Sequence, residues 1–157
     1  MVYYQIQDTK IGPMMIQELE EKIISIKCYK EPLVLSENLM KKETPLLHLA
    51  FEQIQAYLEG RRKKFTIPIQ THGTDFQERV WEALRQIPYG ETRTYGEIAK
   101  QVGNPKAARA VGAANHVNPL IIVTPCHRVI GSNHQLVGYA EGIDIKEKLL
   151  KMEKENR

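Results

Sequence analysis

Cysteine is scarce in this sequence. Only Cys28 and Cys126 occur among its 157 residues, too few for a disulfide framework, although sequence alone leaves one bridge between them open. Neither belongs to a Cys-x-x-Cys pair, and the histidines other than His127 show no mutual ligand spacing. The sequence therefore predicts reduced thiols and no metal site.

Long apolar runs are also missing. No run approaches the roughly 20 residues that a membrane-spanning helix needs, and the first residues lack the basic and apolar regions of a signal peptide. A hydrophobic content of 42% with 26% charged residues is typical of a folded soluble chain. We expect a cytoplasmic protein with no membrane partner.

Strong net charge is the third absence. A formal charge of +3 does not by itself indicate a nucleic-acid partner. Residues 92–140, however, contain five lysines and arginines against one acid, Glu97. This basic segment is compatible with phosphate contacts and equally with an ordinary solvated face.

The N-terminal part has two short β-type runs, at 2–6 and 23–26, with a Gly12-Pro13 turn between them. A helix is predicted from the cap at Thr44 to about Gly60. The basic tetrad 61–64 that follows fits a solvated linker better than a nucleic-acid site.

The C-terminal part reads as a series of short helices. Capping boxes begin helices after Thr74 and Thr94, and Asn104-Pro105 is predicted to open a third helix ending near His116. Two short helices joined by a tight turn at 103–104 indicate a helix-turn-helix. A last helix from about residue 144 is predicted to turn four apolar side chains inward: Ile145, Leu149, Leu150 and Met152.

The third of these helices is rich in alanine. Small side chains suit close packing in a helical core, but they also let a helix backbone approach a nucleic-acid groove with Arg109 protruding. Spacing alone leaves both interpretations open. The alanines concerned are Ala107, Ala108, Ala110, Ala113 and Ala114.

Cys126 has sequence neighbours that are unusual for a structural cysteine. The apolar run 120–123, predicted as a buried strand or extended segment, leads into Pro125, and His127 and Arg128 follow the cysteine. A thiol attacks only as thiolate, which requires a nearby base or positive charge. The residues leave two hypotheses, a reactive nucleophile or a buried structural cysteine, whereas Cys28 has no comparable neighbours and is read as structural.

The run 125–130, Pro-Cys-His-Arg-Val-Ile, resembles the active-site signature of the 6-O-alkylguanine-DNA alkyltransferases, also called methylated-DNA–protein-cysteine methyltransferases. The resemblance is dense from Gly73 to Glu153 and weak over the first 70 residues. Further motifs that fall in the family's order lie at 73–77, 80–81, 87–92, 95–96, 109–112, 118–119 and 138–139.

The resemblance implies two domains. Residues 1–70 would form a small α/β domain with a ribonuclease-H-like, three-stranded antiparallel sheet and a helix. Residues 71–157 would form a mostly α, winged-helix-like domain that contains the helix-turn-helix, binds DNA and carries out alkyl transfer. The family works without a cofactor on alkylated double-stranded DNA, and we expect a monomer.

The resemblance also implies how DNA is read. The second helix of the helix-turn-helix would enter the minor groove with its alanine-rich face, and the damaged nucleotide would be flipped out of the duplex. Arg109 matches the residue that fills the resulting gap. Tyr95 matches the residue that assists flipping and donates a proton to the departing guanine.

For the transfer itself, the resemblance makes Cys126 the nucleophile that keeps the alkyl group, so each molecule acts once. His127 would activate the thiol through a water, and Glu153 would orient His127. Asn118 matches a residue that braces the turn before the active site. The base would be bound by Tyr139, the Ala140 amide, and the Cys126 and Val129 carbonyls.

Two positions depart from the family pattern. Glu141 and His134 stand where glycines are usual, both in the loop that walls the pocket. Three other hypotheses remain: a related module that binds alkylguanine without repairing it, a cysteine hydrolase, and a transcription regulator. The first normally lacks the nucleophile, the second needs a distant base, and the third needs a further domain.

Overall fold

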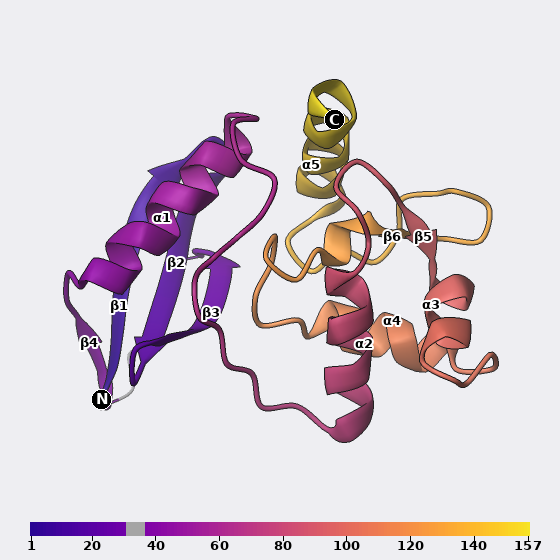
Figure 1. The fold of residues 1–157 in the computed structure, drawn as a ribbon, viewed down its shortest axis with the longest axis horizontal. Coiled ribbons are helices and arrows are strands. Elements are labelled where there is room, and N and C mark those ends of the chain that lie inside the picture. The colour runs from indigo at the N-terminus through magenta and orange to yellow at the C-terminus, as the bar shows by residue number, and fades with distance from the viewer. Residues whose placement is uncertain (31–36) are drawn as a thin grey trace. The chain divides into compact units, whose positions relative to one another are not determined.

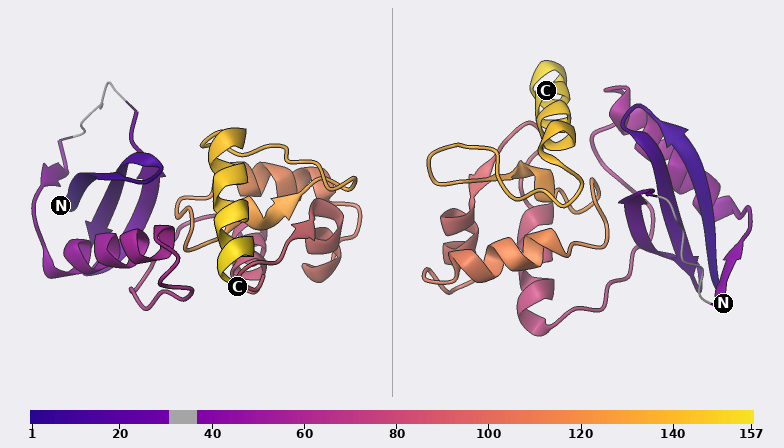
Figure 2. Two further views of the ribbon diagram at one scale, coloured as in Figure 1. Left: turned by 90° about the horizontal axis from the view of Figure 1, so that it is seen from above. Right: turned by 180° about the vertical axis from the view of Figure 1, so that it is seen from behind.

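The computed structural model describes residues 1–30 and 37–157, which form an N-terminal unit of residues 1–71 and a C-terminal unit of residues 72–157. Figures 1 and 2 show each unit as a ribbon. Within the described residues, no helix has the length and apolar character needed to cross a membrane.

The N-terminal unit is built on a meander of three antiparallel strands, as the fold class predicted, with a short fourth strand parallel to β1 (Figure 1). The predicted turn at Gly12-Pro13 is wrong, because these residues begin β2. The strand was missed because three successive side chains, those of Met14, Met15 and Ile16, are buried, which hides the alternation that marks a strand. The strands along the chain are β1 (Val2–Thr9), β2 (Gly12–Leu19), β3 (Lys22–Cys28) and β4 (Leu39–Lys41). Their order in the sheet is β3-β2-β1-β4.

Helix α1 (Pro45–Leu58) lies across the sheet (Figure 1), as predicted from its Thr44 cap. The Thr44 hydroxyl accepts a hydrogen bond from the Leu47 amide and donates one to the buried Glu18 carboxylate on β2. The cap therefore satisfies a backbone amide in the first turn of the helix and also joins the helix to the sheet. The buried side chains between them include Ile16, Ile26, Phe51 and Ile54.

The C-terminal unit is mostly helical. Both predicted capping boxes are present, at Thr74 and Thr94. Two short parallel strands and a 3₁₀ turn complete the unit, and α2 packs against both α3 and α4. Its elements are α2 (Asp75–Arg85), β5 (Arg93–Thr94), α3 (Tyr95–Gln101), α4 (Ala108–His116), η1 (Cys126–Arg128), β6 (Val129–Ile130) and α5 (Ile143–Asn156).

Trp81 on α2 anchors this unit. The indole is buried, and its Nε1 donates to the Ala114 carbonyl of α4 over 2.9 Å. A Cβ on Gly73 would lie 2.7 Å from the indole ring, so only glycine fits there. The hydrogen bond from Trp81 to Ala114 therefore joins α2 to α4.

Two local predictions in this unit, the start of α4 and the form of residues 120–123, need correction. Helix α4 begins at Ala108, not at Asn104, because the Asn104 carbonyl accepts the Ala107 amide in a separate turn. Residues 120–122 are buried as predicted and Val123 is half-buried, but the run is a turn, with the Thr124 amide bonded to the Leu120 carbonyl and a positive φ of 74° at Ile122.

Helix α5 buries a different face from the one predicted. Leu149 points inward as expected, whereas Ile145, Leu150 and Met152 are only half-buried. Lys146 and Glu153 are fully buried instead. Hydrophobic periodicity could not find this face, because two of its members are charged.

We predict that the hairpin between β2 and β3 stores backbone strain. Glu20 and Glu21 join the paired residues Leu19 and Lys22, and both have positive φ, at 51° and 63°. Such two-residue turns favour Asn-Gly. The double substitution Glu20→Asn/Glu21→Gly should therefore raise the free energy of unfolding by about 1–2 kcal/mol in urea denaturation.

The matched control is Glu20→Gln/Glu21→Gln, which removes the same charges and leaves the strain. An equal gain in both double variants would assign the effect to charge repulsion instead.

Candidate active site

Cys126 begins the 3₁₀ turn η1 and is 3% exposed. The chain reaches it through a turn braced by Asn118, whose Nδ2 donates to the Thr124 carbonyl over 2.8 Å. The Leu120 amide donates in return to Asn118 Oδ1 over 3.0 Å. The geometry accounts for Asn118 as a brace of the segment that holds the thiol.

The Cys126 thiol is protonated in the free protein. Burial raises its pKa to about 11, although a hydrogen bond from Asn118 and the positive charge of Lys146 act in the opposite direction. The adjacent basic residues therefore do not by themselves make a thiolate. A base has to remove the proton when the thiol reacts.

Glu153 of α5 is the centre of a buried charge cluster. Its carboxylate accepts hydrogen bonds from His127 Nε2 at 2.6 Å, from the Arg128 guanidinium at 2.9 and 3.0 Å, and from the Gly90 amide at 3.0 Å. Arg128 also donates to the Ile87 carbonyl over 2.7 Å. Burial alone would raise the pKa of Glu153, but His127 and then Arg128 hold it at about 2.

This cluster fixes the tautomer of His127. Burial lowers the pKa of His127 despite the neighbouring carboxylate, so the ring is neutral. Because the Glu153 carboxylate can only accept, the neutral ring donates from Nε2 and Nδ1 is its basic nitrogen. The structure brings His127 and Glu153 together as the sequence predicted, with Arg128 as an additional partner.

Tyr95 and the pocket loop, residues 131–142, meet at one carbonyl. The Val137 carbonyl accepts from the Tyr95 hydroxyl at 3.1 Å and from Lys146 Nζ at 2.8 Å. Lys146 Nζ also donates to the Val129 carbonyl at 2.5 Å. Burial raises the pKa of Tyr95, which keeps its hydroxyl protonated.

The other residues of the pocket loop differ in burial, backbone conformation and charge. Tyr139 is buried and Ala140 is exposed, so only the first is enclosed in the free protein. His134 has a φ of 62°, the left-handed conformation that suits glycine. The charge of Glu141 reaches the thiol and raises the pKa of Cys126 further.

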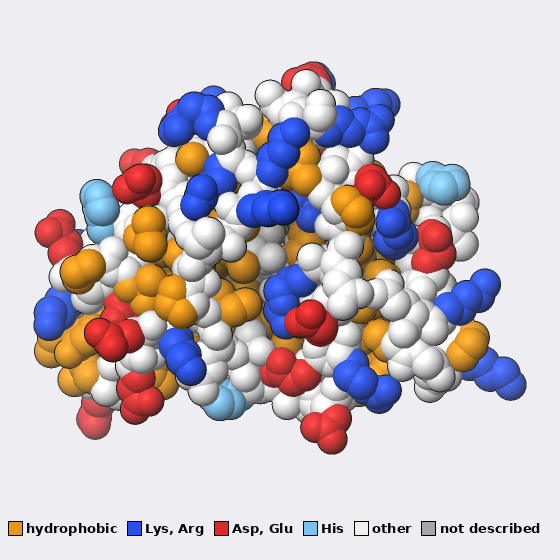
Figure 3. Space-filling model, in the orientation of Figure 1, with side chains coloured by type: hydrophobic (Ala, Val, Ile, Leu, Met, Phe, Trp, Pro, Cys, Tyr) orange, Lys and Arg blue, Asp and Glu red, His pale blue; other side chains and the backbone are white. Residues whose placement is uncertain are grey.

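The predicted DNA-facing helix α4 exposes part of its alanine-rich surface. Arg109, Ala110 and Ala113 are exposed, and Ala107 and Ala108 are half-buried. Ala114 is 2% exposed and packs inward, so its prediction as a groove contact is wrong. On the face drawn in Figure 3, basic and acidic side chains are interspersed, in keeping with the small net charge.

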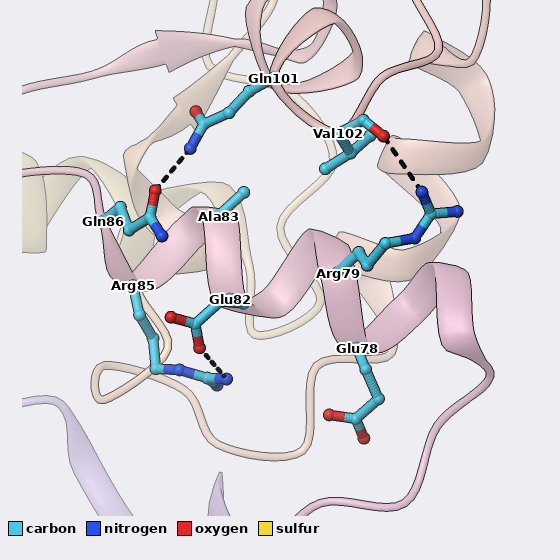
Figure 4. Close-up of a pocket in the computed structure, with 8 residues that line it drawn as sticks. All are labelled: Glu78, Arg79, Glu82, Ala83, Arg85, Gln86, Gln101 and Val102. Carbon is cyan, nitrogen blue, oxygen red and sulfur yellow. Dashed lines mark hydrogen bonds and ion pairs between the residues drawn. The ribbon is translucent and has the colours of Figure 1, made fainter.

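An open groove of about 550 Å³ lies elsewhere on the C-terminal unit, between α2 and the end of α3 (Figure 4). Arg79 donates to the Val102 carbonyl at one end, and Gln101 to Gln86 at the other. Its lining residues are different from those predicted for the reaction.

Sequence reasoning missed three buried polar residues at the site. Arg128 belongs to the recognised motif, yet its ion pair with Glu153 was not foreseen. Lys146 lies seven residues before Glu153 and three before Leu149, so its spacing matches the buried face, but its charge excluded it from a pattern of apolar residues. Asn115 of α4, which donates to the Cys126 carbonyl, gave no sequence signal.

The structure contains no evident metal site within the described residues, since no three His, Cys, Asp or Glu side chains converge there. Neither cysteine forms a disulfide, and Cys126 is buried whereas Cys28 is half-buried. The site thus combines a buried thiol with a neutral histidine on the next residue and an ionised glutamate bonded to that histidine.

Two family descriptions cover almost the whole chain. Residues 2–71 match the ribonuclease-like domain of 6-O-methylguanine DNA methyltransferase, and residues 75–155 match its DNA binding domain. The chain belongs to the 6-O-methylguanine DNA methyltransferase family. The resemblance inferred from the motifs is thereby confirmed.

Relatives of this methyltransferase family match along their full length. A methylated-DNA–protein-cysteine methyltransferase of Methanosarcina acetivorans is 49% identical over 154 residues, 97% of this chain and 98% of that protein. A constitutive one of Bacillus subtilis is 46% identical over 159 residues, with 98% and 96% covered.

The fold class is confirmed by a solved member of the methyltransferase family. The crystal structure of Mycobacterium tuberculosis OGT in complex with DNA has a TM-score of 0.90 to this chain at 42% identity, covering 98% of this chain and 94% of that one.

We predict that the Glu153 cluster makes stability sensitive to acid. The pKa of Glu153 is depressed from 4.5 to about 2, so its contribution is complete above pH 4.5 and is lost as pH falls towards 2. Glu153→Gln should lose about 3–5 kcal/mol at neutral pH. Its free energy of unfolding should also depend less on pH between 4.5 and 2, measured by urea denaturation.

Glu155→Gln, an exposed carboxylate on the same helix, is the control and should behave as the wild type. If the two variants had the same acid dependence, the cluster would not be the source.

Proposed function

We propose that this protein repairs DNA by direct reversal, moving the alkyl group of 6-O-alkylguanine in double-stranded DNA onto Cys126 once per molecule. The observation that carries the proposal is that the buried Cys126 is followed directly by a buried His127 bonded to Glu153, in a member of this family. 4-O-methylthymine is a second substrate to test. No cofactor is needed.

In the proposed step, His127 takes the thiol proton through a bridging water, and the sulfur attacks the alkyl carbon. A sulfur–carbon bond forms as the carbon–oxygen bond to guanine breaks, and the electron pair stays with the base. The basic Nδ1 implied by the Nε2–Glu153 bond supports this role for His127. The thioether product is stable, so the protein is consumed.

Tyr95 would donate the proton that the departing guanine needs. Its hydroxyl is protonated and able to donate, although burial raises its pKa and makes it a weaker acid. In the free protein that hydroxyl donates to the Val137 carbonyl. The flipped base would have to take over this bond, with Tyr139 and the Ala140 amide beside its 6-oxygen.

For DNA, we propose that α3 and α4 act as a helix-turn-helix whose second helix enters the minor groove while the damaged nucleotide is flipped out. The exposed Arg109, Ala110 and Ala113 support this orientation of α4. Residues 71–157 would then be the DNA-binding and alkyl-transfer domain and residues 1–70 a separate domain. We further propose a cytoplasmic monomer, in which both thiols would stay reduced.

The first test is the intact mass of the protein after incubation with a duplex containing one 6-O-methylguanine. We expect a gain of one methylene group on the wild type, never more than one per molecule, and none on Cys126→Ser. Cys28→Ser, which removes the other thiol, should gain the same mass as the wild type.

An unmodified wild type that still retains the damaged duplex would contradict alkyl transfer. It would leave a module that binds alkylguanine without repairing it.

A second test concerns Arg109. If its side chain fills the gap left by a flipped base, Arg109→Ala should slow transfer from duplex DNA on the order of 10-fold. It should have little effect on the same lesion in a single strand, where the base is already unstacked. The measurement is single-turnover methyl transfer from each substrate.

Arg79→Ala removes an exposed arginine of α2 and serves as the charge control. Equal slowing on both substrates in Arg109→Ala would argue against gap filling and in favour of a general loss of affinity.

A further inference from the structure

Asn115 is a buried polar residue on the inner face of α4. It is 2% exposed and lies next to Ala114, which packs against Trp81. Its Nδ2 donates to the Cys126 carbonyl over 3.3 Å. An amide that crosses from a DNA-facing helix to the nucleophile's own peptide has a different position from the brace at Asn118.

Stability does not explain this residue. Within residues 1–30 and 37–157, the Asn115 Oδ1 atom accepts no hydrogen bond although it is buried. A buried acceptor without a donor costs folding free energy, which a leucine of similar shape would avoid. Residues that break a local rule in this way are concentrated at functional sites.

The Cys126 carbonyl is held from two directions. It accepts the Val129 amide, which closes the 3₁₀ turn, and the Asn115 amide, which comes from α4. The Val129 bond fixes the Cys126 peptide within the turn, whereas the Asn115 bond fixes the position of that peptide relative to α4. Because the Cys126 side chain leaves the same residue, a rotation of this peptide moves the sulfur.

Together with Asn118, this bond ties α4 to both sides of Pro125. Asn118 Nδ2 holds the Thr124 carbonyl and Asn115 Nδ2 holds the Cys126 carbonyl. Asn115 lies in the last turn of α4, and Asn118 lies two residues beyond the end of that helix. The nucleophile is thus placed by the end of the helix that would meet DNA.

We propose that Asn115 is a positioning residue for the transfer: its amide holds the Cys126 peptide so that docking of α4 on DNA places the sulfur in line with the alkyl carbon. This inference rests on the proposed function. Displacement of a reacting atom by about 1 Å can slow a reaction on the order of 100-fold, so one bond of this kind has a large effect on rate.

The test is Asn115→Leu, which keeps the shape and removes the donor. We expect single-turnover transfer at saturating 6-O-methylguanine duplex to slow by about 10-fold or more. The Kd for the duplex and the rate of Cys126 alkylation by iodoacetamide should stay within about twofold of the wild type, since neither needs alignment with the base.

The thermal midpoint separates positioning from a structural role. Loss of the unsatisfied amide oxygen should leave the Tm of Asn115→Leu equal to or above that of the wild type. Asn115→Ser, too short to reach the carbonyl, should be as slow. Asn156→Leu is the matched control, because it removes an asparagine that donates to the Met152 carbonyl at the exposed end of α5.

An unchanged transfer rate in Asn115→Leu and Asn115→Ser would overturn the inference. So would a marked fall in Tm or loss of folding in both variants, because Asn115 would then be structural. Failure of the wild type to take up any methyl group would instead refute the proposed function, and the inference with it.

Discussion

The Glu153 carboxylate is the interaction on which the C-terminal unit depends. It lies on the last helix, but its partners come from the turn after α2 and from the turn that contains Cys126. An ionised carboxylate without water is tolerated only when its hydrogen bonds are complete. The carboxylate thus links α5 to the η1 turn and orients the His127 ring, which burial keeps neutral.

Burial shifts the pKa values of the two reacting groups in opposite directions and so leaves both groups neutral. It keeps the thiol protonated, which protects a residue that a single-turnover protein would use only once. It also keeps His127 neutral and able to accept a proton. The ionised Glu153 would stabilise the imidazolium that forms when His127 takes up the proton. In the proposed reaction, the nucleophile is generated only when a base to be repaired is in place.

The pocket loop contains Glu141 and His134, the two positions that depart from the expected family pattern. Val137 joins it to Tyr95 and Lys146 through one carbonyl, and a Cβ on Gly138 would lie 3.2 Å from the Tyr95 hydroxyl. His134 adopts a conformation that glycine adopts without strain, and Glu141 adds a negative charge near the thiol. Such substitutions are tolerated because a loop carries little of the core packing.

The sequence by itself determined the elements that rest on local chemistry. The caps at Thr44, Thr74 and Thr94 predicted the starts of three helices, because a capping side chain bonds to amides within one turn of it. The Pro-Cys-His-Arg motif determined the family and the nucleophile to test. Tertiary structure alone decided that Lys146 and Glu153 are buried and that Ala114 faces inward. The reason is that each of these depends on partners distant in sequence, and hydrophobic periodicity carries no information about which charges will find each other.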